Sequence, residues 1–311
     1  MPERNFQYSS YLAPRYWLLW LGLGVARLLA VFPLRAQWAL GAVIGSLAYH
    51  VLKSRREITQ ANIRACFPEL SAQQQEDLVQ ASFRSNGIGL IEAFRSWFCL
   101  PSRLKQRVRF HGLDNLKAAL DRGRGVILLG GHYSTLDLVG SLTTLEFESD
   151  VLQRDHSNPL FNAFMTGSRQ RLYGKVLGKR DLRAMLKRLR QNKVVWYATD
   201  QDYGRNSTVF VPFFGIKCAT LSSTMKISRS SGAAVVPFSH FRDEKNARYE
   251  IYIHPPLDNF PSDDLEQDAA RLNDILEREI RRAPEQYLWM HRRFKTRPNK
   301  GEVNIYGKVS G

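Results

Sequence analysis

Two long apolar runs open the chain, and a single proline separates them. The first spans residues 17–32 and contains Arg27, whereas the second spans residues 36–52 and carries no formal charge. Each run is close to the minimum of roughly 17–25 residues that an α-helix needs to cross a bilayer. No small-residue cleavage site follows the first run, so the pattern is not that of a cleavable signal peptide. We therefore predict two apolar helices at the N-terminus.

The residues around these runs favour membrane attachment over burial in a soluble protein. Basic and aromatic residues of this kind flank the anchors of membrane proteins. They are Tyr11, Arg15, Tyr16, Trp17, Trp20, Arg35, Lys53, Arg55 and Arg56. We expect residues 1–52 to be a membrane-anchoring helical segment and residues 53–311 to be a domain on the cytoplasmic side. A buried helical pair is the alternative, and spanning the bilayer or lying in its interface both stay open.

Beyond residue 53 the apolar pattern changes from helical to mixed. Residues 53–100 are expected to be helical, with Ser71 and Gln74 forming a capping box. Short apolar runs then predict buried strands at 125–130, 194–198, 233–238 and 249–253, and a C-terminal helix is expected at 265–282. Asp181 is expected to cap a further helix. Strands alternating with helices predict an α/β fold, a central mixed sheet flanked by helices.

A candidate catalytic group follows the first of these strands, in the segment Gly130-Gly-His132-Tyr-Ser-Thr-Leu-Asp137. Loops at the carboxyl ends of strands are where open α/β sheets bind ligands. A helix beginning near Thr135 would put His132 on the turn and Asp137 in the first helical turns, so that the carboxylate can meet one imidazole nitrogen. A neutral histidine held in this way can take a proton from an attacking hydroxyl. A capping aspartate beside an ordinary surface histidine is the alternative.

A second cluster, Asp200-Gln-Asp202-Tyr-Gly204, follows the strand at 194–198. Two acids at a strand end can ligate Mg²⁺, pair with arginines or shape a turn. Because no third ligand or nucleotide motif accompanies them, we favour the pairing and the turn, and expect no metal and no cofactor. The corner that contains Phe214 and Gly215 is expected either to line an apolar slot or to pack in the core.

The positive net charge of the chain indicates an acidic partner. The 311 residues carry a formal net charge of +16, which favours an anionic membrane, an acidic protein or a phosphorylated ligand. Basic residues concentrate between the two strands and near the C-terminus: Arg154, Arg169, Arg171, Lys175, Lys179, Arg180, Arg292, Arg293, Lys295 and Arg297. Nucleic acid is the weakest candidate, since no nucleic-acid motif is recognisable. The three cysteines have no metal-ligand spacing and suit a reducing, cytoplasmic environment.

Several of these segments together resemble a known family. They are 14–18, Asn62-Ile-Arg-Ala-Cys-Phe-Pro-Glu69, the box from His132 to Asp137, 195–198, 200–204, 211–215 and, above all, Pro284-Glu-Gln-Tyr-Leu-Trp-Met-His-Arg-Arg-Phe-Lys-Thr-Arg-Pro298. The chain resembles the late (secondary) acyltransferases of lipid A biosynthesis, the lauroyl/myristoyl transferase type of the lysophospholipid acyltransferase superfamily. The resemblance covers nearly the whole chain.

The resemblance implies an enzyme with a membrane anchor and a cytoplasmic α/β acyltransferase domain at the bacterial inner membrane. It implies an acyl–acyl carrier protein as donor of a lauroyl or similar chain, and a Kdo-bearing lipid A precursor as acceptor. It makes His132 and Asp137 the catalytic pair, with Arg154, Arg169 and Arg171 serving the substrate. Asp200, Asp202, Phe214 and Gly215 are further candidate substrate contacts.

Two departures from the family pattern concern these residues. Many members of the branch carry glutamate where this chain has Asp137, and the usual Tyr-Arg-Pro appears here as residues 153–155, Gln-Arg-Asp. The second departure puts acceptor or acyl-chain choice in question. An acyltransferase for a lysophospholipid or another amphiphile, and a catalytically idle membrane lipid-binding protein, remain as alternatives.

Overall fold

A computed structural model describes residues 8–179 and 181–308, so Arg180 lies outside the described residues. The helices are α1 (Trp17–Ala30), α2 (Leu34–Val51), α3 (Lys53–Cys66), α4 (Ala72–Phe98), α5 (Leu113–Leu120), α6 (Leu136–Thr143), α7 (Pro159–Gln170), α8 (Leu182–Arg190), α9 (Ser223–Ser231) and α10 (Leu265–Arg282). The strands are β1 (Val108–His111), β2 (Val126–Gly130), β3 (Ser149–Gln153), β4 (Val176–Gly178), β5 (Val194–Ala198), β6 (Thr208–Phe213), β7 (Ile216–Leu221), β8 (Ala234–Asp243) and β9 (Arg248–Ile253).

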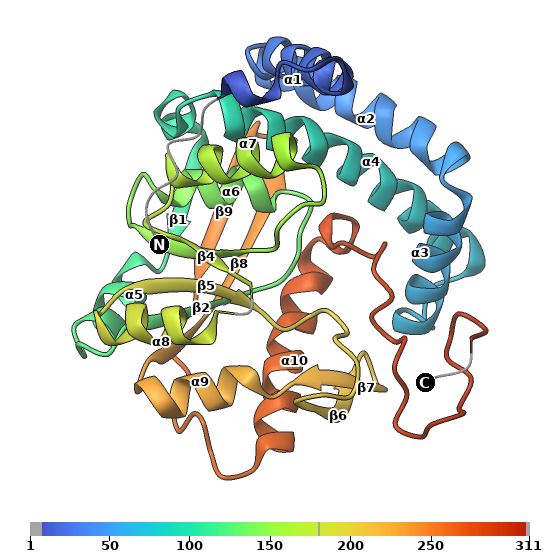
Figure 1. Ribbon diagram of the computed structural model, residues 1–311. Coiled ribbons are helices and arrows are strands. Elements are labelled where there is room, and N and C mark those ends of the chain that lie inside the picture. The colour runs from blue at the N-terminus through green and yellow to red at the C-terminus, as the bar shows by residue number, and fades with distance from the viewer. Residues whose placement is uncertain (1–7, 180, 309–311) are drawn as a thin grey trace.

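Seven of these strands form one mixed sheet, in the order β1-β9-β8-β2-β5-β3-β4. β2 pairs in parallel with both β5 and β8, whereas β8 and β9 pair antiparallel. Helices cover both faces, with α4, α6 and α7 on one side and α8, α9 and α10 on the other (Figure 1). The predicted α/β fold with a central mixed sheet is therefore confirmed.

The central strand β2 is buried on both faces, which explains its uninterrupted apolar run. Leu128 contributes to a core with residues of α2, α5 and α6, and Ile127 contributes to a second core with residues of α8, α9 and α10. The predicted capping box at Ser71 is present and opens α4, and Asp181 accepts a hydrogen bond from the backbone N–H of Ala184 at the start of α8. Local sequence signals thus locate these helix starts correctly.

The two N-terminal runs form α1 and α2, which lie across the top of the molecule (Figure 1). Among the helices that the structure describes, none is long and apolar enough to cross a membrane. α1 has only 14 residues and includes Arg27, and α2 begins with Leu34-Arg35 and includes His50. Of the two modes of membrane attachment left open, the one that spans the bilayer is therefore not represented by any helix in the described part of the chain.

Glycines allow α2 to pack closely on α4. A Cβ atom added at Gly87 of α4 would lie 2.2 Å from the carbonyl oxygen of Gly41 and 2.4 Å from the backbone nitrogen of Gly45 on α2. The indole N–H of Trp38 on α2 also donates to the buried Glu92 carboxylate of α4, at 2.9 Å. The N-terminal helix α2 is thus packed directly against the α/β domain.

We expect Gly87→Ala to destabilise the protein by about 1–3 kcal/mol, because the added methyl group meets backbone that cannot turn aside. Thermal unfolding in detergent measures this loss. The control is Gly22→Ala on the exposed side of α1, where an added Cβ meets nothing within 4 Å. There alanine should stabilise the helix by up to about 1 kcal/mol. Equal melting temperatures for Gly87→Ala and wild type would contradict the close helix packing.

Candidate functional site

His132 and Asp200 lie together because their strands pair in register. Gly130 of β2 is opposite Ala198 of β5 in the parallel pair. His132 and Asp200 each come two residues later, so both side chains leave the same edge of the sheet. Glycine is required at position 130, because a Cβ there would lie 2.7 Å from the indole nitrogen of Trp196. The site is therefore built at the carboxyl ends of two neighbouring central strands.

The Asp200 carboxylate holds His132 with both oxygens. Oδ1 lies 2.6 Å from the imidazole Nδ1, and Oδ2 accepts the backbone N–H of His132 at 2.7 Å. Asp200 is 3% exposed, so this contact is shielded from water. Nδ1 therefore carries a proton and donates a hydrogen bond to Asp200. The other ring nitrogen, Nε2, is left free to accept a proton. Among the described residues, none hydrogen-bonds Nε2.

The two groups shift each other's pKa in opposite directions. Desolvation of the His132 ring opposes its protonation, but the charge and hydrogen bond of Asp200 outweigh this, so the pKa of His132 is raised above 6.5. Burial of Asp200 opposes its ionisation, yet His132 lowers the pKa of Asp200 to about 2. Asp200 is thus a carboxylate at neutral pH, beside an imidazole of enhanced basicity.

We expect histidine-selective ¹⁵N NMR to show His132 titrating at a pH above 6.5. Below that pKa the ring is an imidazolium, and above it the ring is neutral with its proton on Nδ1. His240, buried beneath the loop and paired through Nδ1 with the Thr135 hydroxyl at 2.8 Å, is the internal comparison. Burial lowers the pKa of His240 to about 3, so it should stay neutral throughout. A His132 midpoint below 6.5 would contradict the pairing with Asp200.

Asp137 lies where the sequence predicts it, in the first turn of α6, but its described side-chain partner is not the imidazole. Its Oδ1 is 3.3 Å from a guanidinium nitrogen of Arg169 on α7. The expected hydrogen bond from His132 to Asp137 is replaced by the bond to Asp200, since the strand register already delivers that carboxylate to Nδ1. Asp137 still adds negative charge that favours protonation of His132.

A pocket with a mostly apolar lining begins at this Asp137–Arg169 pair. Its lining comes from β2, β3, β5, β8, α6, α7 and the segment after α7, and consists of Leu128, Leu136, Asp137, Gly140, Thr143, Ser149, Val151, Leu152, Arg169, Tyr173, Trp196 and Phe238. The Trp196 ring also stands edge-on to the His132 ring, with centroids 5.7 Å apart. Such a pocket can receive an apolar chain whose polar end stays near His132.

Asp202, the other acid of the second cluster, binds backbone N–H groups instead of His132. Asp202 accepts hydrogen bonds from the backbone N–H of Gly204 at 2.8 Å and of Thr296 at 2.7 Å. Asp202 therefore shapes a turn and holds the C-terminal segment near the end of β5. This matches the interpretation of Asp202 as a turn residue. Asp200 pairs with a histidine rather than an arginine. No group of metal-ligating side chains occurs among the residues described.

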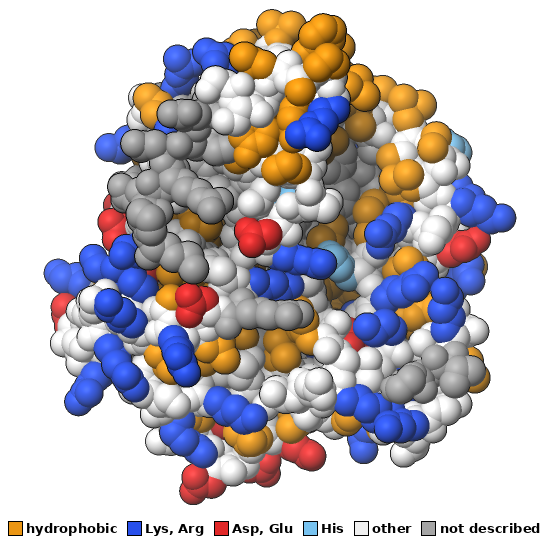
Figure 2. Space-filling model, in the orientation of Figure 1, with side chains coloured by type: hydrophobic (Ala, Val, Ile, Leu, Met, Phe, Trp, Pro, Cys, Tyr) orange, Lys and Arg blue, Asp and Glu red, His pale blue; other side chains and the backbone are white. Residues whose placement is uncertain are grey.

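The three candidate arginines lie at different depths. Arg169 contacts Asp137 and the Gln153 side chain, Arg171 donates to the Trp97 carbonyl oxygen, and Arg154 is exposed. Lysine and arginine side chains border the hollow in which a histidine is visible (Figure 2). The surroundings of the site are thus positively charged and suit an anionic ligand.

Phe214 and Gly215 form the turn between β6 and β7, where Phe214 has a left-handed φ of 51°. The Phe214 ring contacts Phe67 and Trp289, with centroids 5.2 and 5.8 Å away. This is the arrangement of core packing. Neither residue is among those that line the pocket beside Asp137.

The C-terminal segment, residues 284–298, holds the His132 loop through backbone hydrogen bonds. The backbone N–H of Leu288 donates to the carbonyl oxygen of His132 at 2.9 Å, and that of Ser134 donates to Gln286 at 2.7 Å. Asn62 of α3 is buried and donates to the carbonyl oxygens of Trp289 and His291, at 2.7 and 2.8 Å. The local sequence carries no signal for these contacts between distant segments.

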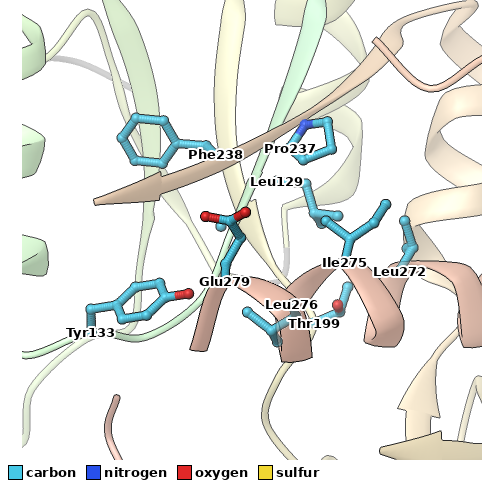
Figure 3. A pocket seen from close by; sticks show the side chains of 10 residues that line it. Leu129, Tyr133, Thr199, Pro237, Phe238, Leu272, Ile275, Leu276 and Glu279 are labelled. Atoms are coloured by element: carbon cyan, nitrogen blue, oxygen red, sulfur yellow. The ribbon is translucent and has the colours of Figure 1, made fainter. Parts of the chain in front are cut away.

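Behind the loop, on the opposite face of the sheet, is a cavity of about 20 Å³ between β2, β8 and α10. Tyr133 and Glu279 point toward it (Figure 3). It has room for about one water molecule. It is therefore part of the support of the loop rather than a substrate pocket.

Comparison with known proteins shows the family to which the chain is similar. Residues 5–296 match the family model of the bacterial lipid A biosynthesis acyltransferases. The chain is 41% identical to the lipid A biosynthesis palmitoleoyltransferase of Escherichia coli (strain K12), over 98% of this chain and 99% of that protein. It is 38% identical to the lauroyltransferase of the same strain, over 93% and 95% of the two chains, and 28% identical to its myristoyltransferase, over 96% and 93%.

Proposed function

Because the chain belongs to the bacterial lipid A biosynthesis acyltransferase family and is an acyltransferase, we propose that His132 is the base that drives its acyl transfer. We also propose an acyl–acyl carrier protein as donor and a hydroxyl of a Kdo-bearing lipid A precursor as acceptor. The observation that supports this most is the His132–Asp200 pair, with Nδ1 held by the carboxylate and Nε2 left for substrate.

The reaction needs only groups of this kind. Nε2 of His132 takes the proton of the acceptor hydroxyl while the hydroxyl oxygen attacks the thioester carbonyl carbon. A C–O bond forms, and the carbonyl oxygen becomes an oxyanion. The C–S bond then breaks as the carbonyl re-forms, and the thiolate of the carrier receives the proton from His132. Asp200 holds the productive tautomer and stabilises the imidazolium.

Asp137 and the arginines serve the substrates in this proposal. Asp137 supports His132 by its charge and orients Arg169 beside the pocket. Arg154, Arg169 and Arg171 stand near the two acidic partners, a phosphorylated lipid and a carrier protein. Guanidinium groups bind phosphate and carboxylate through paired hydrogen bonds.

The N-terminal helices suit attachment in the membrane interface. Large apolar side chains of α1 and α2 are exposed: Trp17, Leu18, Leu21, Val25, Leu28, Val43, Leu47 and Val51. They gather over the top of the molecule in Figure 2. A contiguous apolar surface of this kind marks an interaction site, and a lipid surface fits it. We propose that residues 1–52 lie on the cytoplasmic face of the bacterial inner membrane and hold residues 53–311 there, where a lipid acceptor can reach His132.

The pocket beside Asp137 is proposed to receive the acyl chain. Gly140 and Tyr173 both line this pocket, and a Cβ at Gly140 would lie 2.5 Å from the Tyr173 hydroxyl, so a larger side chain there must displace Tyr173 and narrow the pocket. We expect Gly140→Leu to shift preference toward thioesters shorter by two or more carbons. Each methylene denied burial costs about 0.8 kcal/mol, roughly fourfold in kcat/KM. Competition between donors of different length measures this. Gly167→Leu on α7, where an added Cβ meets nothing within 4 Å, should leave the preference unchanged. The same chain-length profile for wild type and Gly140→Leu would exclude this pocket.

The proposed substrates are tested by product analysis. Wild-type protein in detergent is incubated with acyl-carrier thioesters and either a Kdo-bearing lipid A precursor or a lysophospholipid. We expect an ester product from the lipid A precursor, and little from the lysophospholipid. The reverse preference would establish the lysophospholipid alternative, and no product from any pair would leave the idle lipid-binding alternative.

A further inference from the structure

A second histidine, His291, lies next to the proposed base, His132. The ring of His291 is centred 6.2 Å from the ring of His132, with the two planes tilted by 48°. His291 is exposed at the rim, whereas His132 lies deeper. The two rings are therefore close neighbours, and one substrate group at the surface of the site can lie within hydrogen-bond reach of both.

The backbone that carries His291 is rigidly held relative to His132. Leu288, three residues earlier, donates to the His132 carbonyl oxygen, and the buried Asn62 amide donates to the carbonyl oxygen of His291 itself. The hydroxyl of Tyr306 in turn donates to Asn62 Oδ1 at 2.6 Å. The two histidines therefore belong to one pre-arranged unit, as a catalytic constellation requires.

His291 is a neutral imidazole at neutral pH. Desolvation and the neighbouring charge of His132 lower the pKa of His291, and nearby Arg55 and Lys179 act in the same direction against Asp200. A neutral ring has one N–H donor and one acceptor nitrogen. The Gln201 amide Nε2 donates to His291 Nε2 at 3.5 Å, so the ring proton lies on Nδ1, which is the donor nitrogen.

We propose that His291 donates a hydrogen bond to the thioester carbonyl oxygen as that oxygen becomes an oxyanion during acyl transfer. The inference rests on the proposed function and adds the missing oxyanion donor to it. In the tetrahedral intermediate, the attacking oxygen and the oxyanion are attached to the same carbon. A nucleophile held by His132 Nε2 therefore brings the oxyanion within reach of a donor on the neighbouring ring.

The chemistry balances without transfer of a proton from His291. The hydroxyl proton goes to His132 and from there to the departing thiolate, while His291 keeps its proton and gives only a hydrogen bond. A neutral histidine can fill this electrophilic role because it stabilises a developing negative charge without first having to be protonated.

Other nearby donors fit less well. The Trp196 indole N–H has no described partner, but its nitrogen is buried against the strand backbone at Gly130 rather than exposed at the rim. The Arg169 guanidinium is paired with Asp137 and with Gln153. His291 differs from both in being an exposed histidine next to the His132 ring.

The test compares His291→Phe, which keeps a ring but removes the donor, with His291→Gln, which keeps an amide donor. We expect kcat for His291→Phe to fall about 10²–10³-fold, the effect of deleting one oxyanion donor, with KM changed less than about threefold. His291→Gln should retain clearly more activity than His291→Phe. The matched control is His111→Gln, an exposed histidine of β1 paired with Glu250, which should leave kcat unchanged.

Melting temperatures separate a chemical role from a structural one. Both His291 variants should unfold within a few degrees of wild type, because the ring is exposed; if His291→Phe does not fold, His291→Ala replaces it. A kcat for the donor-free variant within threefold of wild type, an effect on KM alone, or equal losses in the donor-free variant and His291→Gln would each overturn the inference. Failure of the proposed function would look different, because wild type itself would then transfer no acyl group.

Discussion

Replacing His132 by alanine is expected to lower kcat for acyl transfer by about 10⁴-fold, the upper end of what a positioned base contributes. The magnitude follows from the absence of a substitute. The nearby His291 has a lowered pKa and no described carboxylate partner of its own, so it is a poor base. Without Nε2 the attacking hydroxyl must lose its proton to water. Transfer from an acyl-carrier thioester, followed by mass spectrometry of the product, measures the loss.

The folded state of the His132→Ala variant must be checked, because His132 is partly buried and its backbone carries two of the contacts of the site. These backbone contacts, from His132 N–H to Asp200 and from Leu288 N–H to the His132 carbonyl, do not depend on the side chain. We therefore expect a near-native melting temperature. Folded His132→Ala with more than one tenth of wild-type kcat would remove His132 as the base.

Asp200→Asn is expected to be almost as damaging, with kcat lower by about 10⁴-fold, as for other histidine bases that lose their buried aspartate. The carboxylate accepts from both the ring Nδ1 and the backbone N–H of His132. An amide has one acceptor oxygen, so its NH₂ must face one of these nitrogens. If it faces Nδ1, the ring proton moves to Nε2, and the base is in the wrong tautomer. If it faces the backbone N–H, two donors oppose each other.

The same substitution should change the pH dependence in a definite direction. Asp200 raises the pKa of His132 by its charge and its hydrogen bond. Since only the neutral ring accepts a proton, wild-type kcat/KM should rise with pH through a midpoint above 6.5. In Asp200→Asn the residual activity should show this midpoint at lower pH. A midpoint that stays in place would mean that another group controls it.

The sequence predicts the fold well where local signals act. The apolar run of β2, the capping box at Ser71 and the helix before Pro284 each lie within one segment, and all three are present. The membrane-spanning helix is the exception. The two apolar runs and their flanking residues left it open beside attachment in the interface, but none of the described helices is long and apolar enough to cross a membrane, and α2 buries one side against α4.

The site is predicted only in part, because its key contact depends on register. His132, Asp137 and Asp200 are all recognisable as candidates, but a spacing of five residues pointed to Asp137 as the partner. Which carboxylate reaches Nδ1 depends on β2 and β5 being neighbours with Gly130 opposite Ala198. Strand order is a long-range property that periodicity does not encode.

Contacts between distant segments are the other part that the sequence cannot supply. The buried Glu92–Arg242 ion pair, 2.9 Å long, joins residues 150 positions apart, and nothing in either local pattern indicates it. The strap from Leu288 to His132 is similar. The conspicuous C-terminal run was linked to the family, but its physical role, holding the His132 loop and presenting His291, appears only in three dimensions.

The most direct test of the account is a single-turnover comparison of Asp200→Asn with Asp137→Asn, using one acyl-carrier thioester and one lipid A precursor. The two substitutions are chemically identical, and only the position differs. We expect a rate lower by about 10⁴-fold for Asp200→Asn. For Asp137→Asn we expect a loss of only about fivefold, because a partly exposed ion pair contributes on the order of 1 kcal/mol. The reverse order, with Asp137→Asn inactive and Asp200→Asn near wild type, would contradict the assignment of Asp200 as the residue that orients His132.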